Sequence, residues 1–304
     1  MASPDCRQSV DAAWQAFRFA VHATESAREA AEHAERAAIH EEGLAGSGKK
    51  GERHQRMAAI HRRSEQRQRA AERLHGAFAR NLESWLGRQV GASSERPLLM
   101  SAVASTCGWP SAVLTLYSRD GIERLVAASD PTARQAHELE VALAEGPSWE
   151  AARGNATAEN GTDLERRWPQ YGPAVGRLGV HAVAAAPLDL AVDHLRGSLT
   201  VVGEVAPALS LDSFRIGEIA DALARTVLHV PDVVRADGRD LPSLEVFDDE
   251  DFQPALHQAA GVLHERCGWS IDNAIALIRA HAYAEDRPVQ EVADEVVRGG
   301  LLLP

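Results

Sequence analysis

Apolar side chains recur at intervals of three and four residues in two stretches near the start of the chain, 5–42 and 52–87. Both stretches are rich in Ala, Glu, Arg and Gln, which favour helices. A glycine-rich segment, 43–51, lies between them. We therefore predict two long helices joined by a short turn as an antiparallel hairpin.

The hairpin's register can be predicted from its turn. If the turn centres near residue 47, partners in the two helices have residue numbers that sum to about 94. Apolar residues then face one another at the base, and glutamates face arginines toward the tip. The apolar set is Trp14, Phe17, Val21, Leu74, Phe78 and Leu82, and the charged set is Glu25, Glu29, Glu32, Glu35, Arg62, Arg63, Arg67 and Arg69.

The second helix is strongly basic, with ten basic and three acidic residues from Lys49 to Arg80. Three interpretations stay open: neutralisation by the first helix, a nucleic-acid surface, or a dimerising coiled coil. The segment Gly43–Lys50 resembles a phosphate-binding loop, but it lacks the final Ser or Thr and a preceding strand, so it is interpreted as a turn. Histidines at multiples of seven are interpreted as a solvated face rather than a metal ladder: His33, His40, His54, His61 and His75.

The hydrophobic pattern changes at about residue 93. Four short apolar runs predict strands, at 112–117, 123–129, 181–188 and 197–203, and amphipathic stretches near 97–107, 135–144, 165–178 and 211–229 predict helices. Asp120-Gly121 indicates a hairpin between the first two strands. A second hairpin across 189–196 joins the last two, which gives a mainly antiparallel sheet with helices packed against it.

The helical period returns after an Asp- and Pro-rich linker. Apolar residues share one face of a first helix from Ala255 to Leu263, and Cys267-Gly268-Trp269 ends it. Ser270 is the predicted N-cap of a second helix. Arg287-Pro288 begins a third, so a three-helix unit is predicted.

The middle of the chain resembles the GAF domain of actinobacterial GAF–ANTAR regulators. The resemblance rests on Glu145-Gly146-Pro147, Trp168-Pro169, Leu178-Gly179-Val180 and Pro187-Leu188. It implies a domain that binds a small molecule or dimerises. Ser148 stands where relatives often have Cys, so no thiol chemistry is expected there. Candidate pocket residues, each with core packing as the alternative, are Trp109, Tyr117, Trp149, Trp168, Tyr171 and His181.

The segment 257–297 resembles an ANTAR domain. The matching features are Gln258-Ala259-x-Gly261, Ala274, Arg279 with Ala282, and Arg287-Pro288 before Val292-Ala293. Many family members have Lys where this chain has Ala260. The resemblance implies binding to stem-loops in nascent RNA and prevention of transcription termination. Candidate RNA contacts are Gln258, Arg266, Arg279, His281, Tyr283, Arg287 and Arg298.

Composition adds a conflict. The chain has 304 residues, with 32 Lys+Arg against 44 Asp+Glu and a net charge of −12. Residues 233–304, which resemble an RNA-binding domain, hold 14 acidic and 6 basic side chains. Phosphate recognition rests on basic groups. RNA binding therefore requires a few well-placed arginines, and a homodimer that binds two RNA elements gains avidity.

Other chemistry is not indicated. The three cysteines, Cys6, Cys107 and Cys267, are far apart and fit a reducing cytoplasm. No catalytic motif, metal-ligand spacing, cofactor motif, signal peptide or membrane span is found. The pair His264 and Cys267 lacks two further metal ligands.

We therefore predict an α+β multidomain chain: a helical hairpin or coiled coil (1–92), a GAF-like sensor (93–232), a linker (233–250) and an ANTAR-like RNA-binding unit (251–304). The expected function is a non-enzymatic, cytoplasmic RNA-binding antitermination regulator. The alternative is a dimeric scaffold or partner-switch protein that has lost RNA affinity. Clustering of Arg266, Arg279, Arg287 and Arg298 on one face favours RNA binding, and scattering favours the alternative.

Overall fold

The computed structural model divides the chain into two compact units. One comprises Met1–Pro97 with Asp221–Thr226, and the other comprises Leu98–Ala220 with Val227–Pro304. The residues described are 4–42, 48–88, 99–119, 121, 123–190, 195–205, 213–228, 254–285, 287 and 289–301. The linker 233–250, most of the glycine-rich loop, Asp120 and Pro288 lie outside these residues.

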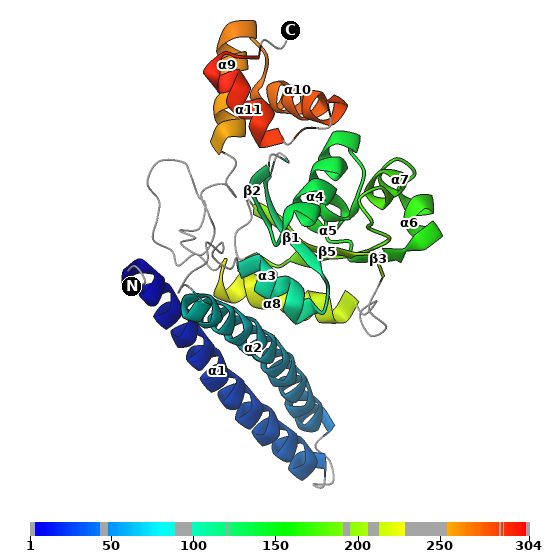
Figure 1. Ribbon diagram of the computed structural model, residues 1–304. Helices are drawn as coiled ribbons and strands as arrows, with labels where there is room; N and C mark the ends of the chain where they lie inside the picture. The colour runs from blue at the N-terminus through cyan, green and yellow to red at the C-terminus, as the bar shows by residue number, and fades with distance from the viewer. Residues whose placement is uncertain are drawn as a thin grey trace. The chain divides into compact units, whose positions relative to one another are not determined.

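The first unit contains the predicted helical hairpin, formed by α1 (Pro4–Glu42) and α2 (Gly48–Arg88) (Figure 1). Its register agrees with the prediction at the apolar base, where a Cβ added at Gly76 would lie 3.1 Å from the ring of Phe17. The buried stripe of α1 is mainly alanine, whereas α2 contributes larger residues such as Leu74 and Leu82. Small side chains on one helix let the other approach closely.

The predicted charge pairing is formed in part. Arg62 donates two hydrogen bonds of 2.8 Å to Glu35 across the hairpin. Glu32 instead lies 4.0 Å from Arg28 on its own helix. His75 does not lie on a solvated face as predicted, because it is buried, and burial lowers its pKa.

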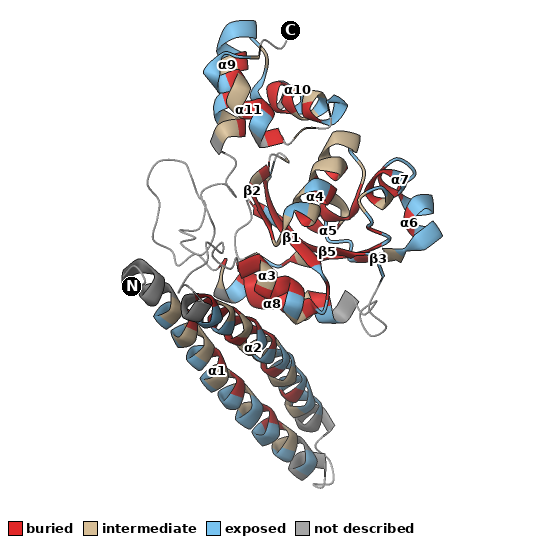
Figure 2. Cartoon of the chain, in the orientation of Figure 1, coloured by how far each residue is buried: buried red, intermediate tan, exposed pale blue. Residues whose placement is uncertain are grey.

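The second unit contains a five-stranded antiparallel sheet in the order β2-β1-β5-β4-β3. The strands are β1 (Ser111–Ser118), β2 (Glu123–Ala128), β3 (Thr157–Asn160), β4 (Ala182–Leu188) and β5 (Leu195–Gly203). Helices cover both faces: α3 (Leu99–Cys107) and the part of α8 (Ser213–Thr226) that belongs to this unit lie on one, and α4 (Pro131–Leu143) and α5 (Pro147–Ala152) lie on the other (Figure 1). The central strands are therefore almost wholly buried (Figure 2).

Both predicted hairpins of the sheet are confirmed, but the structure contains two further elements that the sequence did not predict. β1 pairs with β2, and β4 pairs with β5, each antiparallel. β3 and α5 were not predicted, because four and six residues are too short to establish a hydrophobic period. The single helix predicted at 165–178 is two short helices, α6 (Gly161–Arg167) and α7 (Tyr171–Gly176), separated at Trp168-Pro169.

Three helices follow in the same unit: α9 (Pro254–Cys267), α10 (Ile271–Ala284) and α11 (Val289–Arg298). Their shared core is aliphatic and includes Leu256, Leu263, Ile278, Val292 and Val296. The predicted cap is confirmed, since the Ser270 hydroxyl accepts a hydrogen bond from the backbone N–H of Asn273. Throughout the described part of the chain, every helix is too short or too polar to cross a bilayer.

Replacing Leu74 with Ala should destabilise the hairpin by about 2–5 kcal/mol, because Leu74 is fully buried and its loss leaves a cavity. Calorimetric unfolding of the full chain measures this change. Ile60→Ala on the same helix is the matched control, because Ile60 is 55% exposed and should cost little. Equal effects of the two substitutions would contradict the hairpin core described above.

Candidate functional site

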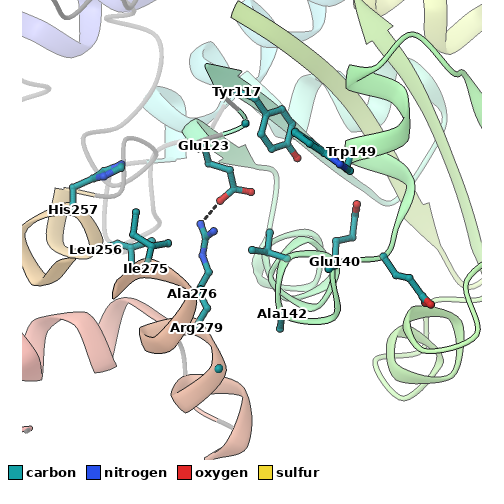
Figure 3. Close-up of a pocket in the computed structure, with 15 residues that line it drawn as sticks. Tyr117, Glu123, Glu140, Ala142, Trp149, Leu256, His257, Ile275, Ala276 and Arg279 are labelled. Atoms are coloured by element: carbon teal, nitrogen blue, oxygen red, sulfur yellow. Dashed lines mark hydrogen bonds and ion pairs between the residues drawn. The ribbon is translucent and has the colours of Figure 1, made fainter. Parts of the chain in front are cut away.

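A cavity of about 620 Å³ lies between the sheet and the C-terminal helices of the second unit (Figure 3). The hairpin of β1 and β2, the region from α4 to α5, and helices α9 and α10 all contribute to its wall. Its size suits a small organic molecule. The lining residues are Tyr117, Gly121, Glu123, Glu140, Val141, Ala142, Ala144, Glu145, Trp149, Leu256, His257, Ile275, Ala276, Arg279 and Ala280.

An aromatic pair forms one wall of the cavity. The rings of Tyr117 and Trp149 meet edge to face, with centroids 5.0 Å apart. Gly121 makes room for this arrangement, because its φ is +89° and an added Cβ would lie 2.9 Å from the indole of Trp149. The guanidinium of Arg153 lies 4.7 Å from the centroid of the Trp149 ring, a cation–π contact.

A buried carboxylate, Glu123, lies at the centre of the site. It begins β2, and its side chain is only 6% exposed. One carboxylate oxygen, Oε1, lies 2.6 Å from Nε2 of His137 on α4. The other, Oε2, accepts a hydrogen bond from the guanidinium of Arg279 on α10.

The charges in this cluster stabilise one another. Burial favours the neutral acid, but Arg279 and His137 hold the pKa of Glu123 well below its usual range. Burial also disfavours the imidazolium of His137, yet the charge of Glu123 raises the pKa of that histidine. Glu123 is therefore a carboxylate between a histidine in the core, whose protonated form it favours, and an arginine supplied by the C-terminal helices.

A second buried carboxyl, Glu140, closes the floor of the site. Its oxygens accept hydrogen bonds of 2.8 Å from the backbone N–H and the hydroxyl of Ser148. Burial raises the pKa of Glu140 to about 7. Gly146 is required beside it, because a Cβ there would lie 2.3 Å from Cγ of Glu140. The Ser148 hydroxyl is itself fully buried and also lies 2.9 Å from Thr200 Oγ1, so it has a structural role in this conformation.

The remaining polar side chains of the wall contribute little positive charge. Burial lowers the pKa of His257, so this imidazole is neutral near pH 7. Glu145 accepts hydrogen bonds from the backbone N–H groups of Gln170 and Tyr171, at 2.9 and 3.1 Å. Arg279 is the cationic side chain among the lining residues, against the three carboxyl groups of Glu123, Glu140 and Glu145.

Of the six predicted pocket residues, Tyr117 and Trp149 line the cavity. The other four lie elsewhere. Trp168 and Tyr171 belong to a buried cluster with Leu164 and Val183. Trp109 is buried near Gly203, and His181 is exposed. Core packing therefore accounts for three of the four, which was the alternative considered for each of them.

Three of the seven predicted RNA contacts, His281, Arg287 and Arg298, lie near the carboxylate of Glu295, whereas Arg279 faces the sheet. Arg279 points toward the sheet and Glu123 (Figure 3). Arg287, at the start of α11, pairs with Glu285 and Glu295, whereas Arg298, at its end, pairs with Asp294. Arg266 lies near Gly299. Gln258 and Tyr283 are exposed, and His281 lies 3.3 Å from Glu285.

Glu123, His137 and Glu140 are not among the residues predicted from the sequence, although a signal for two of them exists. Ala133, Ala136, His137 and Glu140 follow an i, i+3, i+4, i+7 spacing, and all four are buried. Ionisable residues on the buried face of a helix indicate a paired or functional group. Glu123 gives no comparable signal, because the first residue of a strand is often exposed.

Within the described ranges, no group of three or more His, Cys, Asp or Glu side chains is arranged to hold a metal ion. Cys107 is buried, and burial raises its pKa to about 12, so it behaves as a small apolar residue.

No family model matches the chain, and no curated protein is significantly similar to it.

The raised pKa of Glu140 predicts a pH-dependent stability. The folded pKa of about 7 exceeds the usual 4.5, so the fold binds this proton more tightly than the unfolded chain. The resulting stabilisation is complete below about pH 4.5 and is lost as the pH rises to about 7, with a total on the order of 3 kcal/mol. Glu140→Gln should remove this loss, and calorimetry at about pH 5 and pH 8 measures it.

The matched control for this experiment is Glu165→Gln on α6, which replaces an exposed carboxylate. It should leave the pH dependence of stability as in the wild type. A Glu140→Gln protein that loses as much stability as the wild type between the two pH values would show that Glu140 is ionised in the fold.

Proposed function

We propose that this protein is a ligand-responsive regulator with a GAF-like sensor and an ANTAR-like output that binds RNA stem-loops in nascent transcripts. The sensor comprises the sheet and its flanking helices, and the output comprises α9–α11. One observation carries the proposal: Arg279, a candidate RNA contact on the output, is bound to Glu123 at the wall of the sensor cavity. The choice of RNA as target rests on the resemblance of segment 257–297 to ANTAR domains.

The ion pair supports a physical link between sensing and output. Arg279 is only 11% exposed while it binds Glu123, so it is withdrawn from any nucleic acid in this conformation. A ligand that competes for the cavity shifts the population toward a state with Arg279 released. No chemical step is needed, and we propose a non-enzymatic regulator acting in the cytoplasm as a homodimer.

A specific observation favours the alternative, a scaffold or partner-switch protein. Arg287 and Arg298 are paired with carboxylates of the same three helices, and Arg279 faces the sensor. Each of these three arginines is therefore engaged by a carboxylate, as expected of an output without strong RNA affinity. In that case the released face of α10 binds a protein rather than RNA.

An electrophoretic shift assay at low salt, with RNA that carries two stem-loops, distinguishes the two functions. Glu123→Gln weakens the hold on Arg279, so it should tighten RNA binding about tenfold relative to wild type, a difference of about 1.4 kcal/mol. Adding Arg279→Ala to this variant should reverse the gain. Glu150→Gln is the matched control, because Glu150 pairs with Arg167 within the sensor.

If neither wild type nor Glu123→Gln shifts the RNA when protein is in large excess, RNA is not the target. The partner-switch function would then remain. Equal RNA affinity of the two proteins would instead show that the Arg279–Glu123 pair does not control the output.

A further inference from the structure

The cavity wall already binds two guanidinium groups of the chain itself. Arg279 is held by the carboxylate of Glu123, and Arg153 lies over the ring of Trp149. A carboxylate beside an aromatic ring is a typical site for an organic cation, since the ring face and the carboxylate both attract positive charge. Figure 3 shows Arg279 reaching from α10 to Glu123, with Tyr117 and Trp149 beyond it.

We propose that the cavity is a binding site for a small organic cation with an apolar body, an amine or guanidine, and that Arg279 is a built-in competitor for the cation position. The proposal rests on the sensor role proposed above and names the class of ligand that the sensor takes. In the absence of ligand, Arg279 neutralises Glu123. When the ligand binds, its cationic group takes the place of the guanidinium.

The lining fits a ligand of this kind in charge and in shape. Three carboxyl groups lie in the wall, its histidine is neutral near pH 7, and Arg279 is the cationic side chain among the lining residues. Most other lining groups are apolar: the rings of Tyr117 and Trp149, the aliphatic Leu256 and Ile275, and several alanines. On α10, Ala276 and Ala280 flank Arg279 with small side chains, which leaves space beside the guanidinium.

The partners of Glu123 explain why the ligand must be a cation. Oε1 of Glu123 is bound to His137 inside the core, and Oε2 is bound to Arg279 at the cavity. If Arg279 leaves, Oε2 becomes a buried and unpaired charged acceptor, which is strongly unfavourable. A neutral molecule restores at most a hydrogen bond, and an anion adds repulsion. Only another cation restores both the charge and the hydrogen bond.

The exchange also gives the ligand control over α10. Arg279 joins the C-terminal helices to β2, and α10 packs against α4. A cation that replaces the guanidinium removes the ion pair but keeps Glu123 neutralised. The sensor then stays folded while Arg279 is released to the output surface.

The test uses two probes of nearly equal shape on the full chain. Propylguanidinium copies the end of the Arg279 side chain, and propylurea is its neutral counterpart. Isothermal titration should show that Arg279→Ala binds propylguanidinium at least about tenfold more tightly than wild type, because the internal competitor is gone. Propylurea should bind neither protein, and adding Glu123→Gln to Arg279→Ala should abolish binding of propylguanidinium.

Two further proteins keep the test decisive. Arg298→Ala removes an exposed arginine that pairs with Asp294, and it should behave as wild type. If Arg279→Ala does not fold, Arg279→Gln retains an N–H donor for Glu123 and replaces it in the titration. Equal affinity for the two probes, or no binding of propylguanidinium to the folded Arg279 variant, would overturn the proposal.

These titrations contain no RNA, so they are independent of the output. Binding of propylguanidinium without binding of RNA would support the cation site and favour the partner-switch function over RNA binding. Binding of RNA without binding of propylguanidinium would support the RNA-binding output and refute the proposed class of ligand.

Discussion

The organisation of the second unit depends on one requirement, that both oxygens of a buried carboxylate have partners. Glu123 begins the edge strand of the sheet and is almost fully enclosed. His137 satisfies it from α4, and Arg279 satisfies it from α10, 156 residues further along the chain. Leaving such a charge unpaired is far more costly than breaking an exposed ion pair. The ion pair between Arg279 and Glu123 joins α10 to the sheet. In the proposal above, a cation that competes for Glu123 therefore weakens this connection.

Glu140 is a second buried carboxyl group, and it is stabilised in a different way. It lies on the same helix face as His137, but Ser148 supplies its hydrogen bonds in place of a cation. Burial raises its pKa to about 7, so its neutral form is well populated near neutral pH. The turn at Gly146-Pro147 follows from this arrangement, because a side chain at Gly146 would occupy the space of Glu140. A glycine that resembled a family marker thus has a direct steric cause.

The acidic side chains of the C-terminal helices have a structural role. Their carboxylates engage their own arginines, with Glu295 bound to Arg287 and Asp294 bound to Arg298. Arg279 is the exception, since its partner belongs to the sheet. The arginines that the resemblance suggested as RNA contacts are thereby engaged by carboxylates of the chain itself. On the function proposed above, these helices bind nucleic acid only when their arginines change partners.

The sequence by itself determined the local elements: the two long helices and their register, four of the five strands, both sheet hairpins, and the cap at Ser270. These depend on hydrophobic period, glycine and capping chemistry, which act within a few residues. Only the tertiary structure decided the site. Arg279 lies 156 residues from Glu123 in the sequence, and Trp168 and Tyr171 resemble pocket residues in composition but pack in the core. A charged or aromatic residue gives the same local pattern in either setting, because its role is set by the partners that folding brings to it.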